Sequence, residues 1–431
     1  AVNDPFAGGT HLNDLTLLQP VHVGGRLVAW VANRAHHADV GGEAPGSMPA
    51  HATRVSQEGV IVSPMVAAEG GAWAPPFLEP FLEATRTPAE RRGDLAAQLG
   101  ANAAGAIRVA ELVDQMGVET FGRMSAHLGA YGERRMHAAI DALPDASVTF
   151  TDHMEWKGAL VPITVDLTID GGSLTADFTR TADQVQGNIN AVRAVTGSCL
   201  AYAVRVVADP TIPSTGGAHR PLRLITRPGS LVDALPPVAV AAGNVETSQR
   251  IADVLLGALA QIAPDRVPAA SQGTMNNVAF GGLVEGRPFV YYETIGGGHG
   301  AGPAGEGLSG RHSHMTNTRN TPVEALEPNL PVRVLQYSLR AGSGGDGQYC
   351  GGLGICREYE FFAPATVTLN SERRRYAPSG LRGGRPGATG KNRVVRAGVE
   401  TEVGGKAAFV VQPGDRLIVE TPVGGGWGKP Q

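Results

Sequence analysis

The amino-acid sequence predicts a mixed α+β fold, with antiparallel sheets, a helical hairpin and a β-rich C-terminal third. Three patterns indicate this class. Apolar and polar residues alternate from Val161 to Asp170, as in a half-buried strand. Apolar residues recur at helical spacing on both sides of Gly117. Alternating runs such as 365–370, with turn signals such as Pro413-Gly414-Asp415, fill the C-terminal third.

Length and composition indicate a folded enzyme of several parts. At 431 residues the chain is long enough for two or three domains. Its 59 glycines are about twice the usual share and cluster in short stretches, which favours glycine-rich loops within a folded enzyme. We expect a metal-site hairpin with proline-rich wrapping loops over 1–92, an α+β core over 93–330 and a β-rich domain over 331–431.

Charge, hydropathy and cysteine content exclude several classes of protein. A net charge of −4 without a basic stripe argues against a nucleic-acid partner. No apolar run approaches the roughly 20 residues of a membrane span. The three cysteines form neither a metal-binding spacing nor an even disulfide framework, which predicts a reduced, cytoplasmic protein.

The first forty residues predict a hairpin that gathers metal-ligand types. Two β-type runs, 15–21 and 27–31, flank the turn signal Gly24-Gly25. Such a hairpin brings together the polar residues at its two ends, which are His11, Asp14, His36 and His37. Imidazoles and a carboxylate suit Zn²⁺, Mn²⁺ or Fe²⁺. The alternative is two polar loops that contain histidine by chance, and the spacing alone does not decide between them.

The middle of the chain predicts loops, helices and a strand meander. Residues 43–92 are rich in proline and indicate wrapping loops, a lid or a subunit contact. Residues 93–143 predict a helical hairpin, and residues 147–178 predict antiparallel strands. We expect the apolar stripe of the second hairpin helix to pack in the core; it consists of Phe121, Met124, Leu128 and Tyr131.

Two further helices are expected, one buried over 189–207 and one amphipathic over 251–262 with Asn244 as its N-cap. The N-terminal end of the second helix would offer backbone N–H groups and Arg250 to an anionic group of a substrate. The alternative is simple capping with a surface ion pair.

Three later features have simpler interpretations. The glycine-rich stretch 296–307 lacks the Lys-Ser/Thr of a phosphate-binding loop, so we place no ATP site there. His312 and His314 form either a second metal site or, more simply, polar residues satisfied in a packed loop. The charge run 372–375 is expected to be a solvated face.

Motifs along the whole chain resemble one known family. In order, they are Asn3-Asp4-Pro5-Phe6, Gly8-Gly9-Thr10-His11-Leu12-Asn13-Asp14, Arg34-Ala35-His36-His37-Ala38-Asp39, Pro45-Gly46-Ser47-Met48-Pro49, Gly243-Asn244-Val245-Glu246-Thr247-Ser248-Gln249-Arg250, Ser271-Gln272-Gly273-Thr274-Met275-Asn276-Asn277, Tyr291-Tyr292-Glu293-Thr294, His312-Ser313-His314-Met315, Arg382-Gly383-Gly384 and Gly424-Gly425-Gly426-Trp427-Gly428. The chain thereby resembles the B subunit of the hydantoinase/5-oxoprolinase family.

The resemblance implies a set of site residues. His11, Asp14 and His36 match the positions that bind one divalent transition metal, Zn or Mn with Fe as an alternative, in metal-containing relatives. His37 and Asp39 are then expected to support the ligands or accept a proton. Arg250 and Glu293 are expected to contact the substrate.

The resemblance also implies partners. A further ligand, an upstream carboxylate, would come from a segment or chain that precedes Ala1, and without it apolar surface near Leu12, Leu15 and Leu17 would be exposed. An A subunit would use ATP and Mg²⁺, which this chain would not bind.

The implied activity is ATP-dependent opening of a small cyclic amide, such as 5-oxoproline, a hydantoin or a lactam. Phosphorylation of the amide oxygen on the A subunit would make the carbon electrophilic, and a metal here would activate the attacking water. The alternatives are a subunit of an ATP-dependent ketone carboxylase and a non-catalytic assembly subunit.

Overall fold

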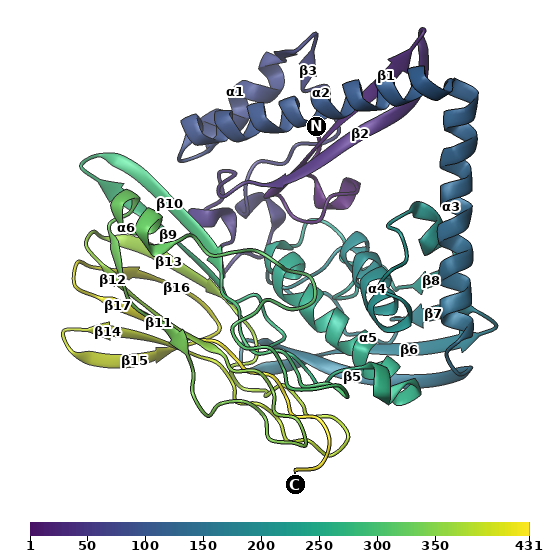
Figure 1. Cartoon of the computed structure of the whole chain (residues 1–431). Coiled ribbons are helices and arrows are strands. Elements are labelled where there is room, and N and C mark those ends of the chain that lie inside the picture. The colour runs from purple at the N-terminus through teal and green to yellow at the C-terminus, as the bar shows by residue number, and fades with distance from the viewer. Residues whose placement is uncertain (431) are drawn as a thin grey trace.

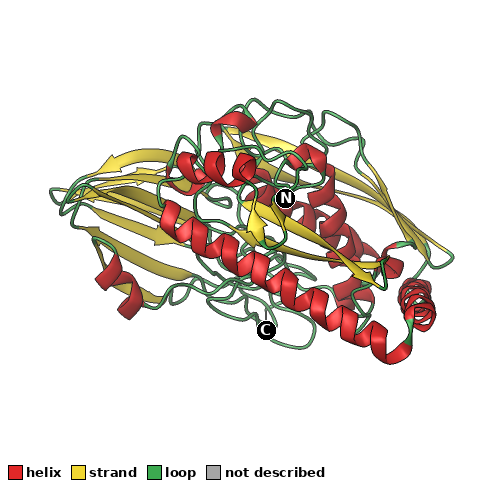
Figure 2. Cartoon of the chain, turned by 90° about the horizontal axis from the view of Figure 1, so that it is seen from above, coloured by secondary structure: helices red, strands yellow, loops and turns green. Residues whose placement is uncertain are grey.

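The computed structural model describes residues 1–430, and its N-terminal hairpin has the predicted form. Strands β1 (Asp14–Val23) and β2 (Arg26–His36) pair antiparallel around Gly24-Gly25. Both glycines have positive φ, as a tight hairpin turn with the matching twist requires. Helix α2 (Pro88–Met116) packs along the hairpin (Figures 1 and 2).

The N-terminal apolar residues are covered by the chain itself. Leu12 and Leu15 are fully buried and Leu17 is almost so, which differs from the apolar surface expected there in the absence of a preceding segment. They belong to a hydrophobic core that extends to Met275.

The proline-rich segment contains a helix that the sequence analysis missed. Helix α1 (Pro75–Ala84) begins at two consecutive prolines. Proline fits the first turn of a helix because the backbone N–H there has no helical partner. The other elements before α2 are short: η1 (Pro5–Ala7), η2 (Pro45–Ser47), η3 (Val55–Gln57), β3 (Ala68–Glu69) and β4 (Ala72–Trp73).

Helices α2 and α3 (Val118–Asp141) meet at Gly117 as predicted, but they diverge instead of packing side by side (Figure 1). The prediction that the stripe of α3 lies in the core is wrong, since Met124 and Leu128 are 50% and 53% exposed. The buried face carries Gly132, Met136 and Ile140. A Cβ on Gly132 would lie 2.1 Å from Oγ1 of Thr215, so only this face can approach the 215–219 segment closely.

The central sheet confirms the predicted meander. Strands β5 (Ala146–Trp156), β6 (Ala159–Asp170) and β7 (Ser173–Asp177) are antiparallel, and β8 (Leu222–Ile225) joins β7 in parallel. Two helices expected from the sequence, α4 (Arg193–Ala208) and α5 (Ser248–Ile262), pack together beside this sheet (Figure 1).

The start of α5 differs from the prediction. Asn244 is not an N-cap, because it lies inside a π-helical turn, η5 (Gly243–Thr247), that leads directly into the helix. A Cβ on Gly243 would lie 1.8 Å from the backbone oxygen of Asn190, so this turn is pressed against the neighbouring loop. Two other short helices are η4 (Gly216–His219) and η6 (Pro264–Arg266).

The C-terminal part is β-rich, as predicted, and forms two sheets around a second hydrophobic cluster. One sheet has the order β10-β9-β13-β16 and the other β11-β12-β17-β14-β15. Strands β9 and β10, together with helix α6, were not predicted. The bounds are β9 (Asn277–Val284), β10 (Arg287–Thr294), α6 (Val323–Asn329), β11 (Val332–Leu339), β12 (Ile355–Phe361), β13 (Ala365–Asn370), β14 (Lys391–Arg396), β15 (Val399–Val403), β16 (Lys406–Val411) and β17 (Arg416–Glu420). Among the described helices, none has the length and apolar character needed to cross a membrane.

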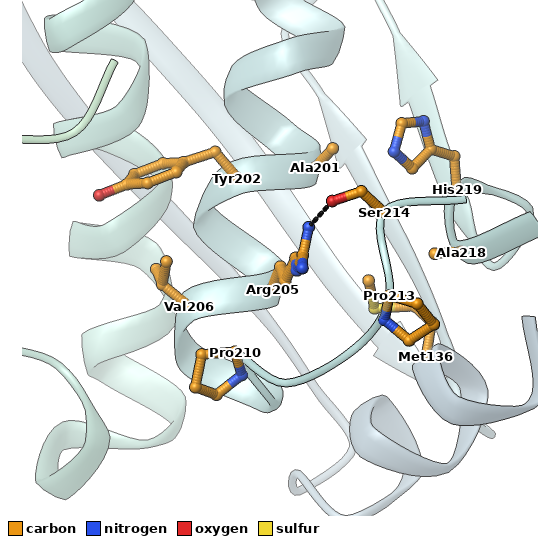
Figure 3. Close-up of a pocket in the computed structure, with 10 residues that line it drawn as sticks. All are labelled: Met136, Ala201, Tyr202, Arg205, Val206, Pro210, Pro213, Ser214, Ala218 and His219. Atoms are coloured by element: carbon orange, nitrogen blue, oxygen red, sulfur yellow. Dashed lines mark hydrogen bonds between the residues drawn. The ribbon is translucent and has the colours of Figure 1, made fainter. Parts of the chain in front are cut away.

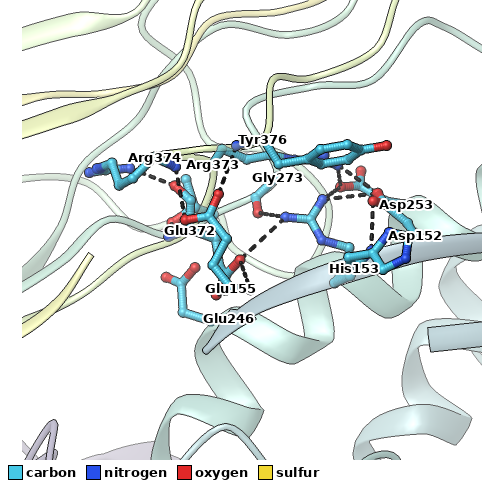
Figure 4. A network of polar contacts seen from close by, with 12 residues as sticks. Asp152, His153, Glu155, Glu246, Asp253, Gly273, Glu372, Arg373, Arg374 and Tyr376 are labelled. Carbon is cyan, nitrogen blue, oxygen red and sulfur yellow. Dashed lines mark hydrogen bonds and ion pairs between the residues drawn. The ribbon is translucent and has the colours of Figure 1, made fainter. Parts of the chain in front are cut away.

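The first half of the charge run after β13 is buried, so the prediction of a solvated face is wrong for Glu372 and Arg373, while Arg375 is exposed. Glu372 is fully buried and Arg373 is 1% exposed. Arg373 donates to Asp152 on β5 and Asp253 on α5, both at 2.8 Å (Figure 4). Arg373 can be buried because the opposite charges of Asp152 and Asp253 face it. These ion pairs connect the two hydrophobic cores.

Candidate metal centre

The hairpin register brings three metal-ligand side chains together. Asp14, the first residue of β1, is paired with His36, the last residue of β2. His11 precedes them in a turn closed by the Asp14 N–H to the His11 carbonyl at 3.1 Å. Asp14 Oδ2 lies 3.2 Å from His11 Nδ1, and Asp14 Oδ1 lies 3.1 Å from His36 Nδ1. One ligand atom from each residue lies within 4.8 Å of the other two.

The three residues fit a bound cation. His11 is fully buried, and neither of its ring nitrogens has a hydrogen bond, because the contact with Asp14 has the distance but not the geometry of one. Unpaired buried polar atoms are rare and destabilising, and a metal ion is one way to satisfy them. Two imidazoles with one carboxylate form a donor set suited to Zn²⁺, Mn²⁺ or Fe²⁺.

Local electrostatics favour the metal-binding forms of Asp14 and His36. Burial alone would raise the pKa of Asp14, but the neighbouring imidazoles of His11 and His36 hold it well below its usual range. Burial lowers the pKa of His36, against the opposing effect of its hydrogen bond to Asp14. An ionised carboxylate and a neutral imidazole are the forms that bind a metal.

His37 and Asp39 lie beside this centre and have protein partners. His37 is buried, with Nε2 3.0 Å from Oε1 of Gln98 on α2. Asp39 is buried as well, and it accepts hydrogen bonds from Ser47 Oγ at 2.9 Å and Arg86 Nη1 at 2.7 Å. Both therefore fix the loop that follows β2, while the roles in proton transfer or ligand support stay predictions.

Arg250 and Glu293 are buried in ion pairs. Arg250 is fully buried and contacts Asp152 at 3.1 Å and Asp253 at 2.7 Å. Glu293 lies 3.2 Å from Nε of Arg357. Their charges are thus neutralised within the protein, and the substrate-binding roles expected for them stay predictions.

Of the other histidine pair, His314 fits the simpler interpretation, while Nδ1 of His312 is buried without a hydrogen-bond partner. His314 Nε2 lies 3.0 Å from Asp253 Oδ1, in a loop and not on a strand. Within residues 1–430, His11, Asp14 and His36 are the one group of three close metal-ligand side chains. A cavity of about 370 Å³ lies beside α4 and is lined by residues such as Tyr202, Arg205 and Ser214 (Figure 3). His11, Asp14 and His36 do not line it.

The sequence analysis missed Tyr292 as a residue of this centre. Its ring centroid lies 5.0 Å from that of His36. Its hydroxyl donates to Asn277 Oδ1 at 2.7 Å, and the Asn277 amide donates to Glu246 Oε1, also at 2.7 Å. All three occur in the motifs of the resemblance, but strands β9 and β10, which place Tyr292 and Asn277 opposite the hairpin, were not recognised.

The family model described as hydantoinase B/oxoprolinase matches residues 1–430. The chain belongs to this family. Membership confirms the resemblance that the sequence motifs predicted.

Two relatives show the extent of the similarity. MJ0963 of Methanocaldococcus jannaschii is 38% identical over 429 residues, which are 100% of this chain and 75% of that protein. 5-Oxoprolinase 1 of Arabidopsis thaliana is 37% identical over 454 residues, 99% of this chain but 35% of that protein. The chain therefore spans about a third of the plant 5-oxoprolinase.

Two solved structures share the fold. The ATP-dependent caprolactamase from Pseudomonas jessenii has a TM-score of 0.91 and 26% identity, over 99% of this chain and 76% of that one. Nucleotide-free acetone carboxylase has a TM-score of 0.90 over 100% of this chain and 64% of that one. Its identity is 17%, so this second likeness concerns the fold alone.

Proposed function

We propose that this chain is the metal-containing hydrolytic subunit of an ATP-dependent cyclic-amide hydrolase. The observation that carries the proposal is the convergence of His11, Asp14 and His36 at one end of the hairpin in a member of this family. The likeness to an ATP-dependent caprolactamase supports a lactam, hydantoin or 5-oxoproline as the class of substrate.

The division of labour follows from the chemistry of the amide. A cyclic amide is resonance-stabilised, so an ATP-using A subunit would first phosphorylate the amide oxygen and make the carbon electrophilic. When bound, a divalent ion lowers the pKa of water and polarises an oxygen of the substrate. His11, Asp14 and His36 would hold that ion, and Tyr292, packed on His36, would form one wall beside it.

The experiment that tests the proposal combines metal analysis with an activity panel. The chain, co-purified with its A subunit, is assayed on 5-oxoproline, hydantoins and lactams with and without ATP. We expect one transition metal per chain and ring opening only with ATP. A metal-free complex that is fully active would contradict the assignment of the metal centre.

Ketone plus bicarbonate belongs in the same panel, because the fold is shared with acetone carboxylase. Carboxylation without ring opening would favour a ketone carboxylase. The absence of both activities would favour a non-catalytic assembly subunit. A carboxylate ligand from a preceding segment stays a prediction; a longer chain that includes such a segment should retain more metal than residues 1–431.

We predict that the isolated chain neither binds Mg-ATP tightly nor hydrolyses it. The physical reason is that 296–307 lacks the lysine and hydroxyl residue of a phosphate-binding loop. Calorimetry with Mg-ATP should give no micromolar binding, and the A subunit alone serves as the positive control. Tight binding by the isolated chain would overturn the assignment of nucleotide use to the partner.

We predict that the ring of Tyr292 matters more for metal retention than its hydroxyl. Tyr292→Leu removes the ring that packs on His36, and the metal affinity should fall by roughly 10- to 100-fold, as for other supporting residues of metal sites. Tyr292→Phe keeps the ring, so its metal affinity should fall much less. Metal affinity measured against a chelator checks both, with Tyr131→Leu, a half-exposed tyrosine on α3, as the control. Equal affinities for Leu and Phe would show that the ring contact is unimportant.

A further inference from the structure

Three of the four lysines of this chain are gathered in one place. The chain has 36 basic residues, and its lysines are Lys157, Lys391, Lys406 and Lys429. The first three line a single cavity of about 470 Å³. Lysine and arginine are not interchangeable, because an ammonium group is a compact charge on a flexible stem. A chain that uses arginine almost everywhere else thus places three of its four lysines around one cavity.

The cavity is built from four segments that are distant in sequence. Lys157 comes from the β5–β6 turn, and Arg374 and Arg375 follow β13. Lys391 begins β14, and Lys406 begins β16. Five cationic side chains therefore converge where the central sheet meets the C-terminal sheets.

These charges lack carboxylate partners inside the cavity. Among the ion pairs of residues 1–430, none involves Lys157, Lys391, Arg374 or Arg375, and only Lys406 has one, with Glu372. Two carboxylates also line the cavity, Glu155 and Glu402. Glu155 already accepts hydrogen bonds from the backbone N–H groups of residues 374–376. The cavity therefore carries an excess of positive charge.

The cations are held in place by neutral groups. Arg374 donates to Asn392 Oδ1 at 2.9 Å and to Asn276 Oδ1 at 3.0 Å (Figure 4 shows Arg374 beside Glu372). Arg375 donates to the Gly158 carbonyl at 2.7 Å, and Lys157 Nζ lies 5.3 Å from the Trp156 ring centroid. Burial lowers the pKa of Lys406 to about 8 and that of Arg374 to about 10, so their charged forms lack solvation. An anion would add counter-charge on the open side of the cavity, where Lys157, Lys391 and Arg375 have no ion pair.

We propose that this cavity is a binding site for a phosphate group, either inorganic phosphate or the phosphate of a small metabolite. Several cations around one space match a divalent oxyanion with several acceptor oxygens better than a carboxylate with a single charge. Lys157, Lys391 and Arg375 are the exposed residues that would reach the ligand, above the partly buried Arg374 and Lys406. The site is separate from His11, Asp14 and His36, and the inference does not depend on the proposed hydrolase activity.

The scarcity of lysine makes the test direct. The purified chain is labelled with an amine-selective acetylating reagent, with and without inorganic phosphate, at constant ionic strength. We expect phosphate to slow labelling of Lys157 and Lys391 at least severalfold and to leave Lys429, an exposed internal control, unchanged. Equal labelling with and without phosphate, or equal protection of Lys429, would overturn the proposal.

Calorimetry with inorganic phosphate gives a second measurement. The double variant Lys157→Gln/Lys391→Gln should bind phosphate at least about tenfold more weakly, since two charge-assisted contacts are lost. Lys429→Gln should match the unchanged protein, and both variants should keep its melting temperature. Acetate at the same ionic strength should not compete; competition as strong as that of phosphate would reassign the site to carboxylates.

Discussion

Replacing His36 with alanine is expected to weaken metal binding by a factor on the order of 100 or more and to abolish any metal-dependent activity. Supporting residues of metal sites already contribute 10- to 100-fold, and a direct ligand contributes more. His36 is the most suitable ligand to change because its side chain is 32% exposed, whereas His11 is fully buried. Metal content after dialysis and affinity against a chelator measure the effect without relying on activity.

The matched control is His51→Ala. His51 also pairs with a carboxylate, Glu43 at 3.3 Å, but its side chain is 60% exposed and lies outside the cluster. Its metal content should be unchanged, and both variants should keep the melting temperature within a few degrees, since exposed substitutions change stability little. A His36→Ala protein that retains its full metal content would show that the ion, if any, is bound elsewhere.

The sequence was sufficient for this centre because the information is local. A Gly-Gly turn between two β-type runs closes the hairpin, and a register shift between Val21 and His22 then pairs Asp14 with His36. His11 is three residues from Asp14, so no distant contact is needed to bring it close. The strand meander over 146–177 was predictable for the same reason, since alternation and turn residues are encoded within each segment.

Features that depend on distant contacts were not predicted. The spacing of apolar residues in α3 predicts a helix but does not say which of its faces is buried. The buried face is set by the 215–219 segment, which approaches Gly132 closely. Tyr292 joins the metal centre only because β10 passes the hairpin, and nothing in its own segment indicates that. In sequence Arg373 resembles part of a solvated surface until Asp152 and Asp253 are known to face it.

Replacing Arg373 with methionine is expected to destabilise the protein by about 3–5 kcal/mol, the usual effect of removing one partner from a buried ion-pair network. Asp152 and Asp253 would then share Arg250 as their nearby cation, at 3.1 and 2.7 Å, while both carboxylates remain nearly buried. Because Asp152 lies on β5, Asp253 on α5 and Arg373 after β13, the variant should weaken the connection between the two cores. Urea unfolding followed by tryptophan fluorescence would measure the loss.

Arg220→Met is the control for this substitution. Arg220 pairs with Glu133 at 2.6 Å, but the two side chains are 62% and 40% exposed, so removing the pair should change the unfolding free energy by no more than about 1 kcal/mol. Similar losses for the two variants would mean that the buried network contributes no more than a surface ion pair. A large loss for Arg373→Met alone would instead explain why Arg373 is kept in the interior: it holds the β-rich part against the core that contains Asp152 and Asp253.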